Sequence, residues 1–316
     1  MPKALKPQSD VERKIAEETR NSDVRPEFLR AVADEIETRK QSTHDAVVAA
    51  APEAVKEESL TAMPFEKLKT LLAPKGIDLQ KQLDDHVSFM VRMGVLNEKD
   101  AEQYCAKFQT ISVRKSELEN IPKGYKPMFF VDNMTPVQAA KTFITGQDIN
   151  LYECSTLADF TKRDPNNPDK ILENQSPSDL ARLTFTPNVR NLTKNLTGKK
   201  ADTRLDEMKQ GKHFMEPAQW FQMFAECLDK AMTKLNLGNG KQWGDMNDEE
   251  RKAILANTDI DQYLPDLTTW TQFPDYRNQY GSVLDLNWDP GGREVWVSSW
   301  SPGSVGGSLG IRPSLG

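Results

Sequence analysis

Two short stretches decide the fold expected for this chain: Met134-Thr135-Pro136-Val137-Gln138-Ala139-Ala140-Lys141-Thr142-Phe143-Ile144-Thr145-Gly146 and Tyr152-Glu153-Cys154-Ser155-Thr156-Leu157-Ala158. The first predicts a helix with Thr135 as N-cap, Pro136 at the first helical position and a left-handed Gly146 just past its end. The second predicts a further helix that begins at Cys154, because apolar residues follow at helical spacing. The amides and dipole at a helix N-terminus stabilise a thiolate, so Cys154 is predicted to be a nucleophile.

These stretches resemble the catalytic segment of the spore-coat type of bacterial transglutaminase, a family with a papain-like fold. Within residues 134–160, the matching positions are Pro136, Ala139, Ala140, Phe143, Gly146, Tyr152, Glu153, Cys154 and Thr156. Residues 292–311 are similar to two further family segments, through Gly292-Arg293-Glu294-Val295-Trp296-Val297 and Gly307-Ser308-Leu309-Gly310-Ile311. The resemblance implies that Glu294 stands at the position of the acidic catalytic partner.

One element of the family pattern is missing. The last motif of the family carries a histidine, whereas this chain has Gly307-Ser308 there and no histidine after His213. A cysteine–glutamate pair of Cys154 and Glu294 therefore remains as the catalytic arrangement, with His213 as a weaker partner. The long separation of the pair implies a helical insertion between Pro165 and Ile260.

Such a pair would carry out acyl transfer on the glutamine side chains of a protein substrate. The Cys154 thiolate would attack the carboxamide, ammonia would leave, and a lysine amine or water would take the thioester. Glu294 or the adjacent Glu153 would act as base if partial burial raised its pKa, and amides of the Cys154 helix would bind the oxyanion. No cofactor is expected.

Two other functions remain open. The segment Tyr152-Glu153-Cys154-Ser155 is also similar to the start of the active-site helix in NlpC-type cell-wall peptidases, which would make the substrate a peptide bond. The missing histidine instead favours a non-catalytic adaptor or structural protein with a degenerate papain-like fold. In that case the charged N-terminal residues would bind the partner.

The amino-acid composition excludes several other classes of function. A net charge of -6 argues against a nucleic-acid or anionic membrane surface. The three cysteines give neither a disulfide framework nor a zinc pattern, and core packing explains Cys105 and Cys227. His44 and His86 lack a second ligand at metal spacing. The N-terminus has no apolar signal-peptide region, so a cytoplasmic protein is expected, with export open only by another route.

The resulting prediction is an α+β protein in three parts. Residues 1–60 form a polar arm that is expected to bind a partner, residues 61–125 form a helical subdomain, and residues 126–316 form the papain-like region. Within the last part we expect a core helix from Pro217 to Leu235 and a hairpin that turns at Asp289-Pro290-Gly291-Gly292. The segments 164–169 and 191–212 are expected to be a loop and a polar connection.

Overall fold

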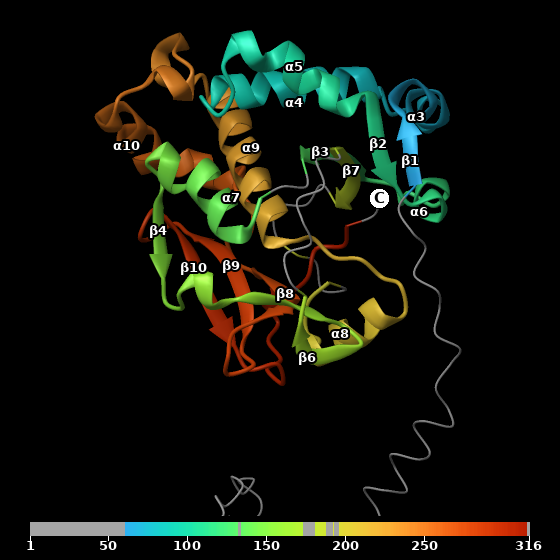
Figure 1. Cartoon of the computed structure of the whole chain (residues 1–316). Coiled ribbons are helices and arrows are strands. Elements are labelled where there is room, and N and C mark those ends of the chain that lie inside the picture. The colour runs from blue at the N-terminus through green and yellow to red at the C-terminus, as the bar shows by residue number, and fades with distance from the viewer. Residues whose placement is uncertain (1–60, 132–133, 173–180, 188–191, 193–195, 315–316) are drawn as a thin grey trace, which may run out of the picture. The chain divides into compact units, whose positions relative to one another are not determined.

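The computed structural model describes residues 61–131, 134–172, 181–187, 192 and 196–314 (Figure 1). Its helices are α3 (Phe65–Leu72), α4 (Leu79–Arg92), α5 (Ala101–Ala106), α6 (Lys115–Glu119), α7 (Pro136–Phe143), α8 (Ala201–Lys209), α9 (Pro217–Leu235) and α10 (Asp248–Ala256). Its strands are β1 (Thr61–Pro64), β2 (Thr110–Val113), β3 (Tyr125–Val131), β4 (Asn150–Glu153), β5 (Thr161–Asp164), β6 (Asn167–Ile171), β7 (Ala181–Pro187), β8 (Trp270–Arg277), β9 (Val283–Asp289), β10 (Glu294–Trp300) and β11 (Leu309–Gly310). The predicted α+β class is confirmed.

A seven-stranded sheet forms the larger of the two sheets in the described part of the chain. Its strand order is β4-β10-β9-β8-β5-β6, with β11 paired to β8. The predicted hairpin is confirmed as β9 and β10, which pair antiparallel from Val283↔Trp300 to Asp289↔Glu294. Strand β4 joins the other side of β10 in parallel, with Asn150 opposite Glu294. Residues far apart in the sequence therefore become neighbours on this sheet.

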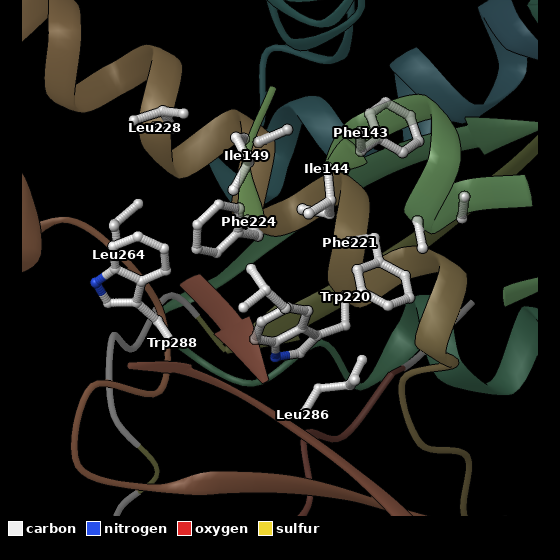
Figure 2. Packing of buried hydrophobic residues seen from close by; sticks show 14 of the residues in the cluster. Phe143, Ile144, Ile149, Trp220, Phe221, Phe224, Leu228, Leu264, Leu286 and Trp288 are labelled. Atoms are coloured by element: carbon white, nitrogen blue, oxygen red, sulfur yellow. The ribbon is translucent and has the colours of Figure 1, made fainter. Parts of the chain in front are cut away.

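Helix α9 packs against one face of this sheet. Pro217 stands at its first turn, Glu216 and Gln219 form a capping box, and Asn236 ends it in the left-handed conformation. Its aromatic side chains meet β9 residues and α7 in one apolar cluster (Figure 2), whose members include Phe143, Trp220, Phe221, Phe224, Leu286 and Trp288. The predicted core helix from Pro217 to Leu235 is thus confirmed, and its side chains are part of the main apolar cluster.

A second, four-stranded sheet lies beside the N-terminal helices. Its order is β1-β2-β7-β3, with β2 and β7 parallel and the other pairs antiparallel. Helices α3 and α4 bury Leu68, Leu72, Leu79 and Leu83 against it in a separate apolar cluster. The expected helical region of residues 61–125 does carry helices, but it also contains β1 and β2, and β2 pairs with β7, which comes later in the chain. The expected arm, residues 1–60, and His44 lie outside the described residues.

Helix α7 follows its predicted start but not its predicted end. Thr135 Oγ1 accepts from Gln138 N, as expected for an N-cap. Gly146 does not take the left-handed conformation; Asp148 does, with φ 56°. A Cβ at Gly146 would lie 2.3 Å from Lys141 O, so close packing is the physical reason for the glycine.

Two expected irregular segments contain regular structure. The run after Arg163 is a tight hairpin, since Pro165 and Asn166 alone form the turn between β5 and β6. Residues 201–209, expected to be part of a polar connection, form α8 with Arg204 and Leu205 buried. Both segments are polar, and contacts with distant parts of the chain stabilise them. Local composition does not report such contacts, so the sequence did not predict this regular structure.

Asp266 forms the centre of a buried polar cluster on the helix-covered side of β8. Its carboxylate accepts from Trp220 Nε1 (2.8 Å), Thr269 Oγ1 (2.7 Å) and Thr271 Oγ1 (2.6 Å). Arg312 Nη2 donates to it at 2.7 Å, and both charged side chains are completely buried. These contacts attach the C-terminal residues to the first turn of α9.

Within the described ranges, no helix has both the length and the apolar character required to span a membrane.

Candidate functional site

Cys154 lies at the end of β4 and not at the start of a helix. Its side chain is exposed. Strand β4 pairs with β10, a bend follows, and the only helical turn nearby is the short 3-10 segment Leu157–Asp159. The expected helix was wrong because parallel pairing with a distant strand extends the backbone through Glu153, and the apolar spacing after it is too short to outweigh that pairing.

The amides expected to form an oxyanion site are already occupied. Cys154 N and Ser155 N both donate to Val297 O, at 2.9 and 3.3 Å. Leu157 N donates to Glu153 Oε1 at 2.7 Å. Glu153 therefore caps the turn that follows the cysteine, which is the ordinary role of a carboxylate beside exposed amides.

Glu294 lies at the other end of the β4–β10 pairing. It is opposite Asn150, four residues before Cys154 along β4. At the usual rise of a strand this corresponds to about 13 Å. Glu294 Oε1 accepts instead from Trp296 Nε1 at 2.9 Å. The structure does not bring Glu294 and Cys154 together.

The remaining histidines and cysteines are in structural surroundings. His86 is buried, with its Nε2 2.9 Å from Tyr104 Oη and its Nδ1 3.7 Å from Glu226. His213 lies between α8 and α9, where its carbonyl accepts from Ser314 N. Burial raises the pKa of the Cys105 and Cys227 thiols. Across the described residues, no group of three or more His, Cys, Asp and Glu could hold a metal ion.

The face of the large sheet that points away from α9 carries a different group of residues. Side chains alternate along each strand, and Leu286, Trp288, Val295 and Val297 point into the core cluster. The opposite face is therefore formed by Asn150, Tyr152, Trp270, Gln272, Arg277, Val283, Asp285, Asn287, Asp289, Glu294, Trp296, Ser298 and Trp300, which we name the aromatic–acidic face. Its carboxylates are Asp285, Asp289 and Glu294, and Arg277, opposite Val283 at the far end of the face, forms an ion pair with Asp202 at 2.7 Å.

Aromatic rings form a row across this face. The Tyr152 and Trp296 ring centroids are 5.1 Å apart, and those of Trp296 and Trp270 are 6.1 Å apart. Tyr152, at one end of this row, is 48% exposed, and Trp300, separate from the row and opposite Val283 at the far end of β10, is 43% exposed. The row thus presents ring surface to solvent at the β4 and β10 side of the sheet.

Beside the aromatic row, three buried side chains have polar atoms without a hydrogen-bond partner among the described residues. Asp285 Oδ1 and Oδ2, Gln272 Oε1 and Nε2, and Asn287 Oδ1 have no hydrogen-bond partner in the described part of the chain. Asp285 is fully buried, and Gln272 lies directly opposite it on β8. Burial raises the pKa of Asp285 well above its ordinary value, and the nearby Gln272 amide offsets this only in part.

Sequence reasoning did not find these three residues. In Val283-Leu284-Asp285-Leu286-Asn287-Trp288-Asp289 the polar residues alternate with apolar ones, a pattern typical of a strand with one face in solvent. Trp296 and Tyr152 appeared only as neighbours of Glu294 and Cys154. The useful signal was the number of tryptophans near the end of the chain, at Trp270, Trp288, Trp296 and Trp300.

The chain was compared with protein families, curated proteins and solved structures, and none of them matches it.

Proposed function

We propose that this chain is a non-catalytic binding protein that holds a lysine- and arginine-rich segment of a partner protein on the aromatic–acidic face. The observation that carries the proposal is the composition of that face: a row of aromatic rings has the carboxylates Asp289 and Glu294 beside it, and the charge of Arg277, at the other end of the face, is paired with Asp202. Adaptor function was one of the three hypotheses from the sequence. The surface now favoured is on the sheet rather than on residues 1–60.

The rings supply the contact area for a cationic side chain. A lysine or arginine over the face of a tryptophan or tyrosine gains about 0.5–2 kcal/mol, depending on how far it is desolvated. Tyr152 and Trp296 lie close enough for one side chain to contact both. Aromatic residues are also the side chains that most often dominate the energy of protein interfaces.

The charges on the face select the sign of the partner. Glu294 lies directly beneath the row, because its carboxylate accepts from the Trp296 indole. Asp289 is its cross-strand neighbour on β9. A basic segment would approach a negative surface on a chain of net charge -6, whereas an acidic segment would be repelled.

The test is to measure binding of two peptides of equal length, one rich in lysine and arginine and one rich in glutamate, by titration calorimetry. We expect the basic peptide alone to bind, and Trp296→Ala to weaken it about tenfold. Glu294→Gln, made as a single variant, should also weaken binding of the basic peptide, and the loss should be larger at low salt. Tyr280→Ala is the matched control, because Tyr280 is 83% exposed in the turn between β8 and β9, outside the face. Binding of both peptides alike, or equal loss in the control, would overturn the proposal.

Acyl transfer on protein glutamine is the second candidate, and the exposed Cys154 thiol is the observation that favours it. A peptidase of papain-like fold would need the same activated thiol. Against both stand the occupied amides and the distance to Glu294. The test is the rate of iodoacetamide labelling of Cys154 at pH 6, compared with free cysteine and with the Glu294→Gln variant. Fast labelling that slows in the variant would establish the enzyme and replace the binding proposal.

A further inference from the structure

The unpartnered atoms of Asp285, Gln272 and Asn287 lie together on neighbouring strands. Gln272 and Asp285 are direct partners in the register of β8 and β9. Asn287 is two residues from Asp285, and therefore on the same face of β9. Ser298 is opposite Asp285 on β10 and adds a hydroxyl to the same row. Three adjacent strands thus bring a carboxylate, two amides and a hydroxyl to one place.

These groups need a partner of their own. More than nine-tenths of each of the three side chains is buried, and five of their polar atoms have no hydrogen-bond partner among the described residues. Buried polar atoms are almost always paired in folded proteins. A buried carboxylate also needs a compensating charge or a proton, and no basic side chain in the described part of the chain forms an ion pair with Asp285, since Arg277 on the same face pairs with Asp202.

The chemistry of the cluster defines what would fit it. Four of the five unpartnered atoms are oxygens of a carboxylate and two amides. Carboxylate and amide oxygens are the ligands that Ca²⁺ takes, usually six to eight of them with waters included, whereas zinc sites use nitrogen or sulfur. The complete burial of Asp285 excludes a lysine side chain from a partner, which could not reach it without opening the sheet. A metal ion is small enough.

We propose that Asp285, Gln272, Asn287 and Ser298 form a binding site for a hard metal cation of the Ca²⁺ type, beneath Trp270 and Trp296. Asp285 supplies the charge and the other three supply neutral oxygens. This site is independent of the peptide surface, because it would stabilise the sheet whether or not a partner binds to the rings.

Terbium is a suitable probe, because Tb³⁺ replaces Ca²⁺ and its emission is sensitised by a nearby tryptophan. The full chain is first treated with a chelator and then titrated with Tb³⁺ while the tryptophans are excited. We expect emission that saturates, that Ca²⁺ displaces, and that falls at least tenfold in Asp285→Asn. Asp169→Asn is the matched control, since it removes the same charge from an exposed position on β6 of the same sheet and should leave emission unchanged.

Thermal unfolding of the metal-free chain provides the second measurement. Millimolar Ca²⁺ should raise the melting temperature of the wild type and of Asp169→Asn by at least about 2 °C, and that of Asp285→Asn not at all. The asparagine variant has nearly the same shape and should fold, so its loss of response would report binding and not unfolding. Absence of both sensitised emission and a thermal shift in the wild type, or equal responses in Asp285→Asn, would overturn the proposal.

Discussion

Asp266 and Asp285 are both completely buried beside neighbouring strands of one sheet, yet their surroundings are opposite. On the face covered by α9, Asp266 accepts from an indole, two hydroxyls and the Arg312 guanidinium. On the other face, neither oxygen of Asp285 has a well-formed hydrogen bond among the described residues, and the cross-strand Gln272 amide only partly offsets its burial. A buried carboxylate surrounded by hydrogen-bond donors is stabilised as part of the core. A buried carboxylate without such donors needs a bound ligand or a proton to be stable. The first cluster is therefore structural, and the second is a candidate site.

Of the variants that test this comparison, Asp266→Ala should have the largest effect on stability. The substitution leaves the Arg312 charge, the Trp220 indole and two threonine hydroxyls buried without their common acceptor. We expect the free energy of unfolding to fall by about 3–5 kcal/mol, measured by urea denaturation. The exposed Asp169→Ala should change it by less than about 0.5 kcal/mol. A loss at Asp266 of similar size to the control would remove the distinction between the two faces.

In the absence of metal, Asp285→Asn should raise the free energy of unfolding, whereas Asp266→Ala should lower it. Because the pKa of Asp285 is raised in the folded state, this group holds its proton there while the unfolded chain releases it above about pH 4. The folded state then binds more protons, so the contribution of Asp285 to stability falls as the pH rises above that value. Urea denaturation of the chelator-treated variant from pH 4 to 8 should show that this fall is absent and that stability at pH 8 exceeds that of wild type. Lower stability of the variant throughout would contradict the interpretation.

Asp275 on β8 is an intermediate case and should give a smaller effect of the same sign. Burial raises its pKa to about 6, and Lys162, whose Nζ is 4.0 Å from the carboxylate, offsets the burial only in part. Between about pH 4 and pH 6 the folded state holds a proton that the unfolded state has lost, so stability decreases with rising pH by about 3 kcal/mol from this group. The difference in unfolding free energy between wild type and Asp275→Asn over that range measures it. A difference that is independent of pH would show that Lys162 compensates the charge fully.

The smallest expected effect is that of Thr271→Val, which removes one of the donors to Asp266. The hydroxyl donates to Asp266 at 2.6 Å and accepts from Arg312 Nε at 3.2 Å in a fully buried position, and the other donors to Asp266 remain. We expect a loss of about 2 kcal/mol in the free energy of unfolding, because one hydrogen bond to each of two charged partners is removed. The exposed Thr145→Val is a suitable control. A loss as large as that of Asp266→Ala would mean that the cluster acts as one unit rather than as separate bonds.

The local elements of this fold were predictable, but the candidate site was not. The capping residues of α7 and the apolar face of α9 are signals that lie within a few residues of each other, as is the turn between β9 and β10. The helix expected at Cys154 failed because the deciding partner, β10, is about 140 residues away in the chain. The resemblance that made Cys154 and Glu294 a catalytic pair depended on that helix, and acyl transfer stays a prediction.

What the sequence by itself determined is the set of elements whose signals are local: capped helices, an apolar helix face, and a hairpin with strands that alternate. What only the tertiary structure decided is which residues meet across strands and which face of a strand is covered. Alternation in β9 places Asp285 and Asn287 on the side away from the core, but it cannot say that this side is buried. Burial depends on segments brought together from distant parts of the chain, so the row of rings and the unpartnered carboxylate became visible only once the sheet was assembled.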